Sequence, residues 1–186
     1  MRFLICLLLS SWSVVCAETG VVTFSAQAPI DPGVYDAPEV AVDCSENYTP
    51  LEAHVVLPEG GIGPNTGLLV HVPGISTGAD CTPGPIYLED WHDSKDLVVA
   101  TVFYRNLSYR FPSDLGKLAI GDVLRGTGAV LDAYPINRKR LYLFGGSGGG
   151  HLALQVYQAT PGLWNEVHAH SAITKITLFK DRDFGY

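Results

Sequence analysis

The stretch LYLFGGSGGGHLALQV, residues 141–156, places glycines on both sides of a single serine, Ser147. An apolar run precedes the glycines, and a segment of helical character begins at His151. This order predicts a strand, an abrupt turn and a helix. Within the turn, residues 145–149 fit the pattern G-x-S-x-G, in which a serine occupies a strained turn between a strand and a helix.

The pattern gives Ser147 a chemical role. A strand that turns at once into a helix directs its central side chain above the sheet, and it needs small residues two positions away on either side. The amide of Gly148, at the start of the helix, then points to where the oxyanion of a reacting carbonyl would form. These features predict that Ser147 is a nucleophile and that Gly148 is an oxyanion donor.

A second pattern overlaps the first. Gly148-x-Gly150-x-x-Ala153 satisfies the dinucleotide fingerprint G-x-G-x-x-G/A. That fingerprint normally opens a nucleotide-binding unit, whereas several predicted strands precede it here, so the context favours the serine turn. A phosphate-binding P-loop is excluded, because no Gly-Lys-Ser/Thr follows the glycines.

The rest of the chain predicts an α/β fold. Its 186 residues, 47% of them hydrophobic, suit one globular domain. Short apolar runs alternate with segments of helical spacing, which indicates a doubly wound, mostly parallel sheet. The predicted strands are residues 51–60, 67–74, 97–104, 140–146 and a last one beginning at 167; the predicted helices are 84–94, 113–134 and 151–159. Glycines within 113–134 would weaken that helix or let it lie close against the sheet.

The N-terminus predicts export. An apolar stretch ends in small residues at Ala17, which is typical of a signal peptide over 1–17, and a turn-rich arm would follow over 18–40 before a domain at 41–186. The mature chain would be secreted or periplasmic, with no membrane span. A disulfide between Cys44 and Cys81 would then form, unless the two are separate buried thiols. The net charge of −7 argues against a nucleic-acid partner.

From Leu51 to about His170 the chain resembles the first half of an α/β-hydrolase, near the secreted esterases and prolyl-oligopeptidase-like enzymes. The specific match is GDVLRGTGAVLDAYPINRKRLYLFGGSGGGHLAL; LEAHVVLPEGG and LLVHVPGISTG match more weakly. The resemblance implies that Ser147 is the nucleophile, that Gly148 and Ile75 supply the oxyanion amides, and that the substrate is a small-molecule or peptide acyl compound. It implies no cofactor. Pro73 stands where the family has histidine.

The resemblance also implies partners for the serine, in the order Ser, then Asp or Glu, then His. Asp181 and Asp183 are preceded by a suitable segment, but no histidine follows either. His151, one turn past the serine, reads as a packing or capping residue. His168 and His170 share one face of a predicted strand. We expect them to be either a pair of metal ligands or ordinary strand residues without a binding role. We therefore expect a serine hydrolase truncated after the nucleophile helix and the following strand; the alternatives are a non-catalytic relic and a dinucleotide-binding domain.

Overall fold

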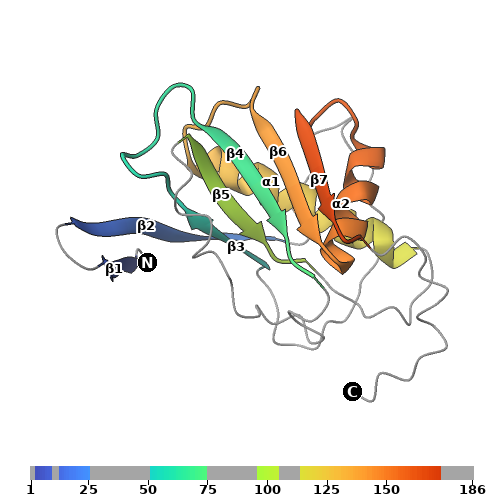
Figure 1. Cartoon of the computed structure of the whole chain (residues 1–186). Helices are drawn as coiled ribbons and strands as arrows, with labels where there is room; N and C mark the ends of the chain where they lie inside the picture. The colour runs from blue at the N-terminus through green and yellow to red at the C-terminus, as the bar shows by residue number, and fades with distance from the viewer. Residues whose placement is uncertain (1–2, 10–12, 26–50, 75–95, 105–113, 173–186) are drawn as a thin grey trace, which may run out of the picture.

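One sheet organises the part of the chain described by the computed structural model, which comprises residues 3–9, 13–25, 51–74, 96–104 and 114–172 (Figure 1). The strands run in the spatial order β1-β2-β3-β5-β4-β6-β7. The elements are β1 Phe3–Leu9, β2 Ser13–Phe24, β3 Leu51–Val56, β4 Gly67–Val72, β5 Leu97–Val102, α1 Asp114–Ala133, β6 Leu141–Gly146, α2 Gly148–Ala159 and β7 Glu166–His170.

The strands on the β7 side of the sheet are parallel. β5, β4, β6 and β7 pair in parallel, whereas β1, β2, β3 and β5 pair antiparallel. The short apolar runs of the sequence became these central strands because each is buried on at least one face, and Val98 to Val102 are buried throughout. The parallel pairing predicted for the central strands is confirmed. The predicted helix 84–94 lies outside the described residues.

The N-terminal part differs from the predicted arm. Residues 19–24 pair with β3, so the start of the segment 18–40 is strand and not irregular. Val21, Val22 and Phe24 favour extended backbone, and the turn residues that suggested an arm come later, outside the described residues. β1 and the first part of β2, residues 13–17, lie within the predicted signal peptide. Its cleavage and the domain limits remain predictions.

Both described helices lie on the same face of the sheet and contact each other (Figure 1). The main core forms between this face and the helices. Gly126 of α1 permits close packing there, since a Cβ at this position would lie 2.3 Å from Cγ1 of Val102 and 2.9 Å from Phe24. Gly128 has no such neighbour within 4 Å in the part of the chain that the structure describes. The expectation that glycines let this helix approach the sheet therefore holds at Gly126 and not at Gly128.

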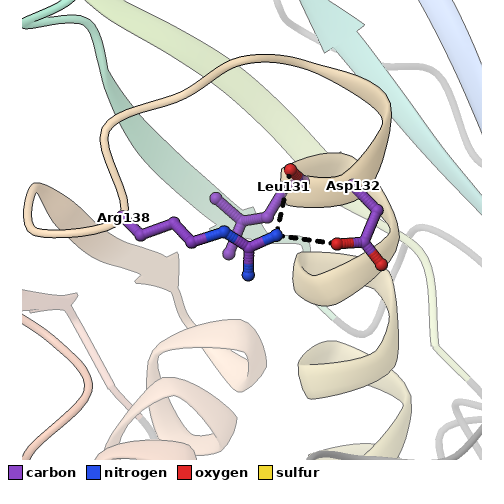
Figure 2. A network of polar contacts seen from close by, with 3 residues as sticks. All are labelled: Leu131, Asp132 and Arg138. Atoms are coloured by element: carbon purple, nitrogen blue, oxygen red, sulfur yellow. Dashed lines mark hydrogen bonds and ion pairs between the residues drawn. The ribbon is translucent and has the colours of Figure 1, made fainter.

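The connector from α1 to β6 is an exposed turn fixed by polar contacts. Arg138 donates from Nη2 to Oδ1 of Asp132 at 2.7 Å and to the carbonyl of Leu131 at 3.3 Å, so it meets the carbonyl end of α1 (Figure 2). Asn137 caps the turn by accepting from the amides of Lys139 and Arg140, each at 3.0 Å. The turn fixes the start of β6, the strand that leads to Ser147.

Candidate active site

Ser147 lies between β6 and α2 in a backbone conformation that is unfavourable for L-amino acids other than glycine. Its φ is 54° and its ψ is −120°, and its side chain makes no capping hydrogen bond to α2. The amide of Ser147 donates to the carbonyl of His170 at 2.9 Å, and its carbonyl accepts from the amide of His151 at 3.2 Å. These bonds hold the residue by its backbone, and its side chain is exposed.

The two outer glycines of the pattern are required by close packing. A Cβ at Gly145 would lie 2.3 Å from the carbonyl oxygen of Gly149, and one at Gly149 would lie 2.2 Å from the carbonyl oxygen of Val72. No real Cβ tolerates such contacts with backbone atoms. The helix begins at Gly148, three residues before the predicted start, because this tertiary packing outweighs the low helix propensity of glycine.

The end of β4 lies beside the turn. A Cβ at Gly74 would be 3.9 Å from the Cβ of Ser147. The hydroxyl of Tyr104 donates to the carbonyl of Pro73 at 2.8 Å, which ties this segment to the end of β5. Sequence reasoning missed Tyr104, because only the parallel pairing of β4 with β5 brings it near Pro73. Ile75, the predicted second oxyanion donor, lies outside the described residues, as do Cys44 and Cys81.

His71 lies one strand away from the turn, on the sheet face opposite the helices. Its Nδ1 is 3.0 Å from Oγ1 of Thr101 on β5, and its ring packs against Phe144 of β6 with centroids 5.6 Å apart. Burial lowers the pKa of His71 from 6.5 to about 4, because the charged ring would lose its hydration. His71 is therefore a neutral structural residue at pH 7.

The other predicted histidines do not complete a triad. His168 and His170 share a face of β7, as predicted, and His168 is paired with Glu166 at 3.1 Å. His151 is half-buried, and its Nε2 is buried with no hydrogen-bond partner among the described residues. Within the described part of the chain no histidine side chain bonds to Oγ of Ser147. Asp181 and Asp183 lie outside it.

Two features are absent from the described residues. These residues hold no group of three or more His, Cys, Asp or Glu side chains arranged to bind a metal ion. None of their helices has the length and apolar character needed to cross a membrane.

The arrangement of this sheet occurs in known peptidases and in a known serine hydrolase. Acylaminoacyl peptidase of Pyrococcus horikoshii superposes with a TM-score of 0.59 at 18% identity, over 85% of this chain and 24% of that one. A fluorophosphonate-binding serine hydrolase of Staphylococcus aureus gives 0.59 at 15% identity, over 90% and 62%. A puromycin-hydrolyzing peptidase of Mycobacterium tuberculosis gives 0.53 at 21%, over 83% and 24%. The chain thus spans about a quarter of the length of these peptidases.

The sheet and the turn at Ser147 define the chain as an α/β-hydrolase-fold protein. Residues 105–185, which make up less than half of the chain, also match the model of the Prolyl oligopeptidase family. No curated protein matches the sequence. The resemblance stated from the sequence is confirmed at this level.

Proposed function

We propose that Ser147 is the nucleophile of a serine hydrolase that cleaves acyl esters or peptide bonds. The observation that carries the proposal is the backbone of Ser147: a non-glycine residue at φ 54° with an exposed side chain, between two glycines that packing requires. Such strain persists only when the surroundings impose it, and it concentrates at functional sites. The family match over residues 105–185 supports the same class.

The reaction would proceed through an acyl-enzyme. Oγ of Ser147 attacks the carbonyl carbon and forms the C–O bond while its proton passes to a base. The bond to the leaving alcohol or amine then breaks, and that group takes up the proton. Water then attacks the acyl-serine and gives a proton to the base; the bond from the carbonyl carbon to Oγ breaks, Oγ takes that proton back, and the acid is released. We assign the amide of Gly148 to the oxyanion, with Ile75 as the second donor, and we place the base and its acid outside the described residues.

The dinucleotide alternative is disfavoured by the surroundings of Gly150. The fingerprint needs its second glycine so that a pyrophosphate can approach the backbone. Here a Cβ at Gly150 would lie 3.0 Å from the carbonyl oxygen of Gly145 and 3.1 Å from the Cβ of Ala172, so protein already occupies that side. A non-catalytic relic would keep the same geometry and differ only in reactivity.

Fluorophosphonate labelling separates these three functions. For the 186-residue chain we expect weak or no labelling, because an unassisted hydroxyl is a poor nucleophile, and strong labelling in a form that supplies the base. Ser147→Ala should abolish labelling. The matched control is Ser171→Ala, since Ser171 is also exposed and has a positive φ of 47°. Saturable NAD binding that is lost in Gly150→Val would instead identify a nucleotide-binding domain, and a base-containing form that fails to label would identify a relic.

We also propose, from the leader alone, that the protein is exported and that its signal peptide ends at Ala17. In an oxidising compartment Cys44 and Cys81 would form a disulfide. The substrate would be a small acyl ester or a peptide, without a cofactor.

A further inference from the structure

Gly146 differs from Gly145 and Gly149, its neighbours in the G-x-S-x-G turn, in the room around its backbone. A Cβ at Gly146 would meet no atom of the described residues within 4 Å, whereas the positions of Gly145 and Gly149 are blocked by backbone atoms. Its φ does not lie in the left-handed region either. Gly146 therefore leaves open space directly beside the exposed Ser147. Gly74, just past the end of β4, approaches the same turn, since a Cβ at Gly74 would lie 3.4 Å from the carbonyl oxygen of Gly146.

His170 borders the same space from the β7 side. β6 and β7 pair so that Gly146 is opposite His170 and Phe144 is opposite His168. All four positions are on the sheet face opposite the helices, because the alternate residues Leu141 and Leu143 belong to the core beneath α1 and α2. The pairing is firmly held, since Asn165 bonds to Leu141 in both directions at 2.8 Å.

The two histidines of β7 differ in whether their side chains already have a hydrogen-bond partner. His168 is paired with Glu166 on its own strand. His170 is exposed and has no side-chain hydrogen bond or ion pair with any described residue. An imidazole carries at least one N–H donor in either protonation state, so His170 can bind an acceptor that enters the space over Gly146.

We infer that the space over Gly146, bordered by His170, is a subsite for a hydrogen-bond-accepting group, preferably a carboxylate, on the acyl substrate of Ser147. The inference rests on the proposed hydrolase function and adds a substrate class to it. The preferred substrates would be short acyl compounds with a carboxylate or carbonyl oxygen a few bonds from the reacting carbonyl. His170 acts here as a specificity residue and takes no part in bond making.

Binding of two matched ligands tests the subsite without relying on turnover. Succinamate and succinamide have the same size and differ only in a terminal carboxylate or carboxamide. We expect succinamate to shift the imidazole NMR signals of His170 saturably at constant pH. Succinamide should bind about tenfold more weakly, because its carboxamide cannot form the charge-assisted hydrogen bond of the carboxylate. His170→Phe assigns the signals and should abolish the preference, and Gly146→Val should fill the space and prevent binding.

His168→Gln is the matched control, because it changes a histidine of the same face and strand that Glu166 already engages; it should leave binding unchanged. The subsite is overturned if succinamate causes no saturable shift of His170, or if Gly146→Val binds it as the unaltered chain does. Fluorophosphonate labelling of Ser147 distinguishes the two failures. Labelling without succinamate binding rejects the subsite alone, whereas binding with an unreactive Ser147 in a base-containing form rejects the hydrolase function and still supports an acceptor site.

Discussion

Acid should destabilise this fold through His71 in particular. In the folded protein the ring lies between Thr101 and Phe144, neither of which titrates, and burial lowers its pKa from 6.5 to about 4. The nearest histidines in the same row of the sheet are His54 and His168, each two strands away. His71→Gln removes the titrating ring and keeps a polar side chain that can still bond to Thr101.

The sign and size of the effect of acid on stability follow from the difference between the pKa of His71 in the folded and unfolded chain. As the pH falls below 6.5 the unfolded chain protonates its histidine before the folded chain does, so unfolding is favoured. The contribution of neutral His71 to stability is fully present above about pH 6.5 and is lost progressively as the pH falls to about 4. The difference between these pKa values corresponds to about 3 kcal/mol in the free energy of unfolding, and most of it should be lost by about pH 4.5.

Urea unfolding at several pH values between 7.5 and 4.5 measures this term. Other groups titrate equally in both proteins, so the difference between the unaltered chain and His71→Gln isolates His71. We expect the unaltered chain to lose about 2–3 kcal/mol more than His71→Gln over this range. His168→Gln, which changes an exposed histidine, should behave as the unaltered chain does. Parallel loss of stability in the unaltered chain and His71→Gln would refute the reasoning.

Two other predictions concern packing and processing. Gly126→Ala should lower the free energy of unfolding by about 2 kcal/mol or more, because its Cβ would overlap Val102. Gly128→Ala should raise the free energy of unfolding by up to about 1 kcal/mol through helix propensity. Equal effects of the two substitutions in urea unfolding would contradict the packing assigned to α1. The intact mass of the exported protein should correspond to cleavage after Ala17, with Cys44 and Cys81 resistant to alkylation until reduced; a retained Met1 or two thiols that react without reductant would reject the leader or the disulfide.

Local patterns were sufficient to predict the central elements of the fold. Apolar runs predicted β3 to β7, periodicity predicted α1, and glycine spacing around Ser147 predicted a strand–turn–helix at residues 141–159. These predictions succeeded because burial on one or both faces of a sheet leaves a direct imprint on residue type. The antiparallel strand over residues 19–24 was missed, since the turn-rich sequence after it dominated the composition of the segment.

The site shows where the sequence reaches its limit. The G-x-S-x-G spacing by itself determined that Ser147 occupies a strained turn, because few other residue patterns allow a strand and a helix to approach so closely. Only the tertiary structure decided that Gly145 and Gly149 serve packing while Gly146 leaves open space. The hydrogen bond from Tyr104 to the carbonyl of Pro73 and the pairing of His170 with Gly146 also became visible only in the tertiary structure. These neighbours come from other strands, and the register that joins them depends on the packing of the whole sheet, which no local pattern of residues encodes.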